Sequence, residues 1–358
     1  MEFRGYKIIN MSMTKTAQKT IAVDNIINKA ANFGNILEVR DLSVKFHKGR
    51  NTGVALDNIS LNIPKGKIIG LVGESGCGKT VLGSTIIGLL PERGAEITSG
   101  NILFNDPENS RSVNLLDLNY HGMKKYRGSR ISMIFQEPMS SLNPIYTIGS
   151  QVGETIKNQD HTLSPAGVRK KTIEILSDVG MPDPSSVHDL YPHQLSGGMR
   201  QRVVIAIAVA NNPDLIIADE PTTALDITIS EQILHLLYKI RGKYNSSIIL
   251  ITHDLGVVAN ICDEVYVMYR GSIFEHGSAA EVFAGPRNPY TVGLMQALPE
   301  FVLHKDKLHV IAGNVPSIFS KTAGCKFYDR CVNAKDICRS EVPAIKFSGE
   351  KHYYRCHF

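Results

Sequence analysis

The sequence contains no tryptophan, and aromatic residues make up only 7% of it. Long apolar runs are missing as well. The longest, Val203 to Ala210, has eight residues, whereas a membrane-spanning helix needs about 20. The N-terminus also lacks the apolar core of a secretory signal. We therefore expect a cytoplasmic chain that reaches a membrane only through partners.

A large excess of either charge is absent too. Lys and Arg number 39 against 34 Asp and Glu, so the net charge is only +5 over 358 residues. This charge is too weak to indicate a nucleic-acid partner. With 43% hydrophobic and 20% charged residues, the composition is that of an ordinary globular protein, and the length predicts about two or three domains.

Close Cys-x-x-Cys pairs, the usual mark of a structural zinc site, are missing from the sequence. Four cysteines nevertheless crowd the end of the chain, with five, six and seventeen residues between them: Cys325, Cys331, Cys338 and Cys356. A reducing compartment disfavours disulfides, and thiolates spaced in this way can hold a [4Fe–4S] cluster. We expect an iron–sulfur cluster first, zinc as the alternative, and four unligated thiols last.

The chain does have a glycine loop with a clear context. The apolar run Ile68–Val72 leads into G-x-x-x-x-G-K-T, and an amphipathic helical pattern follows. Such a strand, loop and helix start bind phosphate through converging backbone N–H groups and the positive end of the helix dipole. Lys79 would reach the β- and γ-phosphates, and the Thr80 hydroxyl would ligate Mg²⁺. The expected nucleotide contacts in this stretch are Gly73, Glu74, Ser75, Gly76, Cys77, Gly78, Lys79, Thr80 and Val81.

Two acids follow a second apolar run, Leu215 to Ala218. Strands buried on both faces of a parallel sheet have this composition, and open α/β sheets bind ligands at the carboxyl ends of such strands. We expect Asp219 to hold Mg²⁺ through water and Glu220 to polarise the attacking water.

Three more residues stand at expected strand ends. Gln136 can reach Mg²⁺ and the attacking water, or it marks a simple boundary between strand and loop. A lone histidine such as His253 is more often structural, but its place beside the same expected site favours catalysis. Phe46 can stack on an adenine ring, or it is an edge-strand core aromatic; residue type alone does not separate the two readings.

Elsewhere, alternating apolar and polar residues predict strands at 37–46 and 54–63, and the polar stretch from Asn105 to Tyr120 predicts a loop. Residues from 139 to about 205 carry helical periodicity. Within them, Ser196 is a natural helix N-cap and precedes two glycines with exposed N–H groups, which makes a second site suited to an anion. We expect residues 1–35 to be a loose tail.

In order and spacing, these motifs resemble an ABC-type ATPase over about residues 36–285. The segment Leu-Ser-Gly-Gly-Met-Arg-Gln is the most specific part, because other phosphate-loop ATPases lack it. The resemblance rests on Gly73–Thr80, Gln136, Leu195–Gln201, Leu215–Glu220, Ala224–Asp226 and His253.

A finer resemblance is to the D-type ATP-binding subunits of dipeptide, oligopeptide and nickel importers. Tyr191–Arg202 looks like the corresponding segment of those subunits. The tail agrees through Asn288–Thr291, Gly324–Phe327 and Arg330–Cys331, although Asn288 stands where His is more usual.

This resemblance implies an α/β fold, with a P-loop NTPase core, an antiparallel β subdomain and a helical subdomain at about 139–205. A small Cys-rich C-terminal domain at 286–358 would carry the iron–sulfur site. The resemblance also implies a head-to-tail dimer in which ATP and Mg²⁺ lie between the loop of one subunit and the glycine helix of the other. Mg²⁺ would be held through Thr80, Gln136 and Asp219. The residues that would contact ATP in trans are Leu195, Ser196, Gly197, Gly198, Gln201 and Asp226.

The implied function is ATP hydrolysis that powers peptide import, at the cytoplasmic face of the cell membrane. The implied partners are a paralogous ATP-binding subunit, two transmembrane permease subunits and an extracytoplasmic substrate-binding protein, with no nucleic acid. One alternative is the same role in a nickel or metal-chelate importer. A soluble ABC ATPase of DNA repair or translation is a second, and an iron–sulfur redox module with a degenerate ATPase is a third; the intact Lys79, Asp219, Glu220 and His253 speak against the last.

Overall fold

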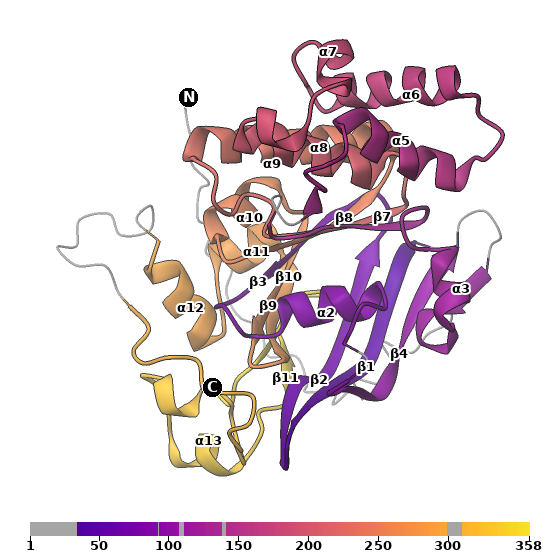
Figure 1. The fold of residues 1–358 in the computed structure, drawn as a ribbon. Helices are drawn as coiled ribbons and strands as arrows, with labels where there is room; N and C mark the ends of the chain where they lie inside the picture. Colours follow the sequence, from indigo (N-terminus) through magenta and orange to yellow (C-terminus); the bar gives the residue numbers. More distant parts are fainter. Residues whose placement is uncertain (1–33, 92, 107–110, 138–140, 299–309) are drawn as a thin grey trace. The chain divides into compact units, whose positions relative to one another are not determined.

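The computed structural model describes residues 34–91, 93–106, 111–137, 141–298 and 310–358. The tail expected at residues 1–35 therefore lies outside the described residues, except for its last two positions. Residues 31–358 belong to one compact unit, and Figure 1 shows its elements in sequence colours.

The larger sheet has the strand order β11-β12-β10-β9-β3-β8-β7-β6. Strands β9, β3, β8, β7 and β6 run parallel to one another, whereas β10 pairs antiparallel with β9. Every residue of β3, β7 and β8 is buried, which explains why these strands read as continuous apolar runs. The bounds are β3 Ile68–Val72, β6 Ile131–Ile134, β7 Leu215–Asp219, β8 Ser247–Thr252, β9 Glu264–Tyr269, β10 Ser272–Ser278, β11 Ile345–Phe347 and β12 Tyr353–Arg355.

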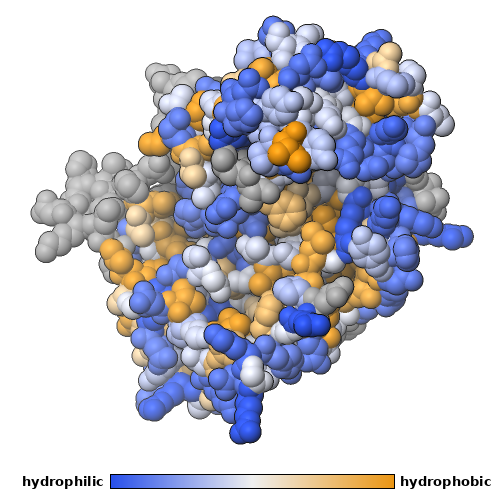
Figure 2. Space-filling view, viewed as in Figure 1, coloured by the Kyte–Doolittle hydropathy of each residue, from blue (hydrophilic) through white to orange (hydrophobic). Residues whose placement is uncertain are grey.

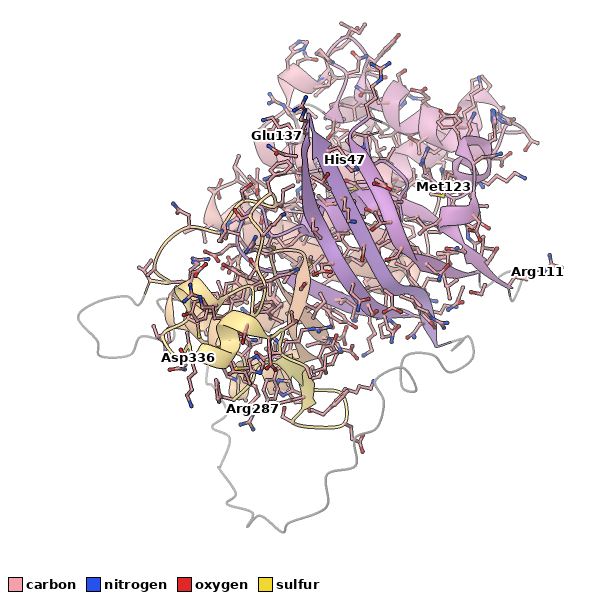
Figure 3. All side chains as sticks on the ribbon, turned by 90° about the horizontal axis from the view of Figure 1, so that it is seen from below. His47, Arg111, Met123, Glu137, Arg287 and Asp336 are labelled. Carbon is pink, nitrogen blue, oxygen red and sulfur yellow. The ribbon has the colours of Figure 1, made fainter. Side chains whose placement is uncertain are left out.

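The second sheet is antiparallel and has the order β2-β1-β4-β5. Figure 3 shows it with His47 labelled at the end of β1 and Arg111 at the start of β5. The alternation at 37–46 and 54–63 falls inside β1 and β2, whose inward residues are buried. The bounds are β1 Asn35–Lys48, β2 Asn51–Pro64, β4 Ala95–Asp106 and β5 Arg111–Asn114.

The prediction of a loop from Asn105 to Tyr120 is wrong in part. Arg111–Asn114 forms β5, which pairs antiparallel with β4, and Leu115–Asp117 and Tyr120–Lys124 form the short helices η1 and α3. No residue of β5 is fully buried, so this edge strand carries no apolar alternation that would reveal it in the sequence.

Helices cover the larger sheet on both faces. Helix α2 packs through Leu82 and Ile86 in a core that it shares with β1, β2 and β3. Helices α5, α6, α8 and α9 share a separate core with β7 and β8, and Figure 1 shows α5 to α8 gathered on that side. The bounds are α2 Lys79–Ile86, α5 Ile148–Gln159, α6 Pro165–Asp178, α7 Pro184–His188, η2 Pro192–Gln194, α8 Gly197–Val209, α9 Ile227–Tyr244, α10 Leu255–Ile261, α11 Ala279–Ala284 and α12 Pro289–Gln296.

The C-terminal region, residues 310–358, is joined to the larger sheet. Strand β12 pairs antiparallel with β10 through Glu275 and His276, and β11 pairs with β12. The region also contains η4 (Tyr328–Arg330) and α13 (Asp336–Ser340), and Asp336 is labelled on α13 in Figure 3.

On the face drawn in Figure 2, apolar side chains lie in small groups between hydrophilic ones. Among the described residues, no helix combines the length and the apolar character that a membrane crossing requires.

Candidate functional site

The phosphate loop follows β3 and ends at the first residue of α2. Gly73, Gly76 and Gly78 have φ values of 152°, 79° and 108°, a region that side chains with a Cβ rarely adopt. At Gly73 and Gly78 there is also no room, because an added Cβ would lie 2.2 Å from the Met268 carbonyl oxygen and 2.8 Å from that of Ala55. Backbone shape and close packing therefore both require glycine here.

Lys79 lies inside this loop and is 5% exposed. Its ammonium group donates to the carbonyl oxygens of Gly73 at 2.7 Å and Glu74 at 3.1 Å. The loop thus concentrates positive charge at the start of α2, as a site for an anion requires.

The two acids stand at the end of β7, next to the loop. Asp219 is 2% exposed, and its burial raises the pKa of its carboxyl group, while the hydrogen bond with Thr80 acts in the opposite direction. Its Oδ1 atom is buried without a hydrogen-bond partner among the described residues. A buried carboxylate oxygen and a hydroxyl side by side are donors that suit Mg²⁺, so these residues fit the expected ion.

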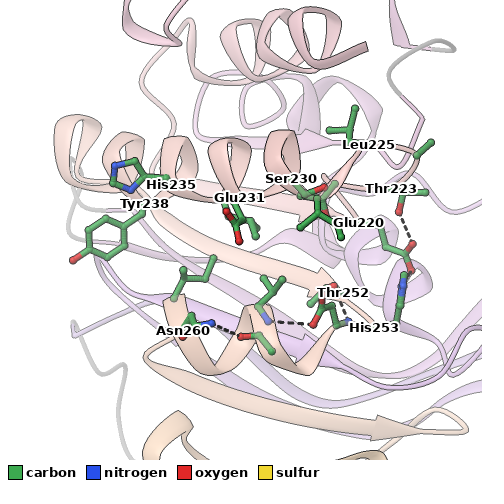
Figure 4. A pocket seen from close by; sticks show the side chains of 18 residues that line it. Glu220, Thr223, Leu225, Ser230, Glu231, His235, Tyr238, Thr252, His253 and Asn260 are labelled. Atoms are coloured by element: carbon green, nitrogen blue, oxygen red, sulfur yellow. Dashed lines mark hydrogen bonds and ion pairs between the residues drawn. The ribbon is translucent and has the colours of Figure 1, made fainter. Parts of the chain in front are cut away.

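The side chains of Gln136 and His253, two other predicted site residues, contact the Glu220 carboxylate. Gln136 Nε2 donates to Glu220 Oε2 at 3.0 Å, and His253 Nδ1 lies 3.3 Å from Oε1. Thr223 Oγ1 donates to Oε2 at 2.8 Å, and Figure 4 shows Thr223 and His253 on either side of the carboxylate. Burial opposes ionisation of Glu220, but the hydrogen bonds from Thr223 and His253 outweigh it and lower its pKa. The carboxylate is therefore held as a base.

One pocket of about 330 Å³ joins the loop to these residues. Phe46, at the end of β1, lines this pocket together with residues of the phosphate loop. A larger cavity of about 830 Å³ between α9 and α10 shares Glu220 and opens beyond His253. The smaller pocket is lined by Phe46, Ala55, Ser75, Gly76, Gly78, Lys79, Thr80, Val81, Gln136, Glu220 and Ile318.

Comparisons with known proteins agree with this geometry. The family described as "ABC transporter" matches residues 56–223, and "Oligopeptide/dipeptide transporter, C-terminal region" matches residues 274–338. The dipeptide transport ATP-binding protein DppD of Bacillus subtilis is 44% identical over 321 residues, which cover 90% of this chain and 94% of that protein. DppD of Escherichia coli is 43% identical over 324 residues, or 90% of this chain and 96% of the relative. The chain belongs to the ABC transporter family. It is an ATP-binding protein of that family and hence an ATPase that powers transport.

Solved structures agree on the fold of this ABC ATPase. The post-hydrolysis dimer of the ATP-binding cassette MJ0796, bound to ADP and Pi, superposes with a TM-score of 0.60 at 27% identity. The match covers 68% of this chain and 98% of MJ0796. The protein cbiO1 of Clostridium perfringens gives a TM-score of 0.59 at 30% identity, over 70% of this chain and 91% of that one.

The residues expected to act in trans lie outside the pocket of this ABC ATPase and divide into two groups. Ser196 caps α8 by accepting a hydrogen bond from Met199 N at 3.3 Å, and Asp226 caps α9 through Ile229 N at 2.9 Å. Ser196, Gly197, Gly198 and Asp226 reach the surface, whereas Leu195 and Gln201 are 3% and 1% exposed. The side chains of the last two are buried within this chain.

The expected iron–sulfur cluster of the C-terminal region is wrong. The four cysteines Cys325, Cys331, Cys338 and Cys356 line one cavity of about 150 Å³. Yet no group of three or more His, Cys, Asp or Glu in the described part of the chain is placed to hold a metal ion, which leaves the zinc alternative without support as well. Burial raises the pKa of Cys331, and burial together with the neighbouring thiols raises that of Cys325 to about 11. Both shifts disfavour the thiolate, which is the form of a cysteine that binds a metal.

Sequence reasoning missed three residues of the site: Ala55, Thr223 and Ile318. Thr223 follows Glu220 by three positions, so the hydroxyl in Glu-Pro-Thr-Thr was a usable signal. Ile318 comes from the C-terminal region, far from every motif, and no local pattern marks it.

Proposed function

We propose that this ABC ATPase hydrolyses ATP to power the import of dipeptides or short oligopeptides through a membrane permease. The peptide assignment is supported by the names of the relatives in Bacillus subtilis and Escherichia coli, which are dipeptide transport proteins. The proposed hydrolysis of ATP rests on one observation. The Glu220 carboxylate accepts hydrogen bonds from Gln136 and Thr223 and lies beside the phosphate loop.

Each residue of the pocket has a proposed role. The adenine ring of ATP stacks on Phe46. The phosphates lie along the loop, where Lys79 and the backbone N–H groups neutralise their charge. Glu220 takes the proton of the attacking water, and His253 and Gln136 orient that water and the γ-phosphate. Mg²⁺ held through Thr80, Gln136 and Asp219 supplies charge neutralisation of the phosphates when bound.

We propose that a paralogous subunit completes the site. Its Ser-Gly-Gly helix start would meet the γ-phosphate of ATP bound to Lys79 here, and Ser196, Gly197, Gly198 and Asp226 would act in the same way toward the partner's nucleotide. The support is geometric, because Ser196, Gly197 and Asp226 are exposed, Gly198 is half-buried, and all four lie outside the chain's own pocket.

We further propose a division of labour along the chain. Residues 36–285 bind and hydrolyse ATP, with the helical part at about 139–205 docked on two permease subunits. Residues 286–358 form a small Cys-rich domain, attached through the pairing of β12 with β10. The assembly would lie at the cytoplasmic face of the cell membrane and receive peptides from an extracytoplasmic binding protein, with no nucleic acid involved.

The test is Glu220→Gln in the full chain, assembled with its partners. The substitution keeps size and hydrogen-bonding capacity but removes the base, so we expect hydrolysis to fall by about 100-fold or more while ATP binding is retained. Glu231→Gln, at an exposed position on α9, is the matched control and should hydrolyse at the normal rate. Undiminished hydrolysis in Glu220→Gln would refute the catalytic role. Uptake of nickel but not of peptides by the wild-type assembly would refute the cargo.

A further inference from the structure

A segment of the C-terminal region lies directly on β2. Val54 N donates to the Ile318 carbonyl oxygen at 3.2 Å. The contact is close enough to need a glycine, since an added Cβ at Gly53 would lie 2.8 Å from Ile318 Cγ1 and 2.9 Å from Phe319 Cδ1. Residues 317–322, here named the base-end segment, are therefore packed against the ATPase core.

A buried arginine fixes the base-end segment at both ends. Arg270, 9% exposed, lies in the turn between β9 and β10. Its guanidinium donates to the carbonyl oxygens of Ser317 at 3.2 Å and Ser320 at 2.8 Å, and to Thr322 Oγ1 at 2.7 Å. Charge-assisted hydrogen bonds of this kind hold a segment without regular structure in one conformation.

The anchored segment places one apolar side chain in the nucleotide pocket. Ile318 lines the pocket together with Phe46, Ala55 and Val81, and both Ile318 and Phe46 are half-buried. Lys79, Gln136 and Glu220 bring the polar groups that suit phosphates and water. The apolar residues are what a purine base and its sugar would meet.

We propose that Ile318 is a nucleotide-contact residue, through which the C-terminal region closes the base end of the ATP site. The inference rests on the proposed ATP binding in this pocket. Its consequence is specific: a contact made by Ile318 acts on the base and sugar and leaves the triphosphate contacts of the loop unchanged.

Two ligands separate these contributions in the full-length protein. MgATP occupies the whole site, whereas magnesium tripolyphosphate occupies only the phosphate end. We expect Ile318→Ala to weaken MgATP binding by about five- to ten-fold, because it removes apolar contact area. Its affinity for tripolyphosphate should stay within about two-fold of wild type, since the loop is untouched. Val342→Ala truncates an apolar residue of the same region that is 65% exposed, and it should bind both ligands normally.

A second variant changes the residue of β2 that Ile318 contacts. Gly53→Ala forces Ile318 away from β2, so it should reproduce the selective loss of MgATP affinity. Equal MgATP affinity in wild type and Ile318→Ala would overturn the inference. So would an equal loss for both ligands, because the segment would then act through the phosphate loop or the fold. Lys79→Met should lose both ligands; if it binds MgATP like wild type, the proposed nucleotide site itself fails.

Discussion

Arg330 and Glu74, 256 residues apart in the chain, form a bidentate ion pair, with Nη1 2.7 Å from Oε2 and Nη2 2.8 Å from Oε1. Glu74 belongs to the phosphate loop and Arg330 to η4 of the C-terminal region. The Arg330 side chain is 5% exposed, and its Nε donates to the Ala312 carbonyl oxygen at 2.8 Å. The hydrogen bonds that Arg330 donates to the Glu74 carboxylate raise the pKa of its guanidinium above its usual range. The C-terminal region thus contacts the phosphate loop through the ion pair of Arg330 with Glu74.

Arg330→Met tests this support. The substitution removes the charge but keeps much of the apolar stem, and it leaves the Glu74 carboxylate half-buried without its partner. We expect the free energy of unfolding to fall by about 2–4 kcal/mol, and MgATP affinity to fall because the loop gains freedom. Urea unfolding and nucleotide titration measure the two effects.

The control for this prediction is Arg339→Met, at an exposed position of α13. It removes the same charge and should change neither quantity. Arg330→Lys should fall in between, since an ammonium cannot make the two parallel hydrogen bonds. Wild-type stability in Arg330→Met would show that the ion pair is incidental.

Much of the core and loop could be predicted from the sequence, because the signals there are local. Ile68–Val72 and Leu215–Asp219 are continuous apolar runs, and buried parallel strands require that composition. The ion pair of Arg330 and the position of Ile318 could not be predicted. They join residues more than 200 positions apart, and nothing in the composition around Arg330 says which carboxylate it will meet.

Thr223→Val tests how Glu220 is kept ionised. The Thr223 hydroxyl donates to Oε2 at 2.8 Å and lowers the pKa of the carboxyl group, against the effect of burial. Valine has the same shape but no hydroxyl, so the pKa of Glu220 should rise. The base is then protonated at a higher pH, and the acid limb of the pH–rate profile should move toward neutral pH.

The lost hydrogen bond is worth about 1 kcal/mol, so hydrolysis near the acid limb should fall by about five-fold. At alkaline pH the rate should approach that of wild type. Thr222→Val, the neighbouring half-buried threonine, is the control and should leave the profile in place. An unshifted acid limb in Thr223→Val would mean that this hydroxyl does not tune the base.

The buried side chain of His276 should make the free energy of unfolding depend on pH. Its ring is 7% exposed, stacks on Tyr266 at 3.9 Å between ring centroids and lies 3.1 Å from the Val265 carbonyl oxygen. Burial lowers its pKa from 6.5 to about 4, and the neighbouring positive groups His352 and Lys351 add to the effect. Because the folded pKa is depressed, the unfolded chain binds the proton more readily. Stability is therefore full above pH 6.5 and is lost as pH falls from 6.5 toward 4.

We expect this histidine alone to cost about 2 kcal/mol of unfolding free energy between pH 7 and pH 5. His276→Gln removes the titration and should therefore lose less stability than wild type over that interval, even though it starts from a lower value at pH 7. Urea unfolding at the two pH values gives the comparison. Equal losses in the two proteins would show that the His276 ring is not the group that titrates.

The cysteines of the C-terminal region show where spacing alone misleads. Their intervals are compatible with a cluster, and the fold does bring all four to one cavity. Metal binding depends on the direction in which each sulfur points and on its ionisation. The spacing of the cysteines in the sequence determines neither. Cys325 and Cys331 are half-buried, and their partial burial raises their pKa values and so disfavours the thiolate form.

Gly197→Trp tests whether the start of α8 is a contact surface for the partner's nucleotide. Gly197 is exposed, and the nearest atom to an added Cβ is Leu225 Cδ2 at 3.6 Å, so the fold accepts a side chain there. An indole would block any triphosphate approaching the N–H groups of the helix. We expect ATP-dependent pairing with the partner subunit, and hydrolysis by the pair, to fall by about 100-fold or more, while the isolated chain binds ATP normally.

The control is Gly242→Trp, on the exposed side of α9 with open space around it, which should pair and hydrolyse like wild type. Because both variants carry the same bulky residue, normal pairing in Gly197→Trp would remove the α8 start from the shared site.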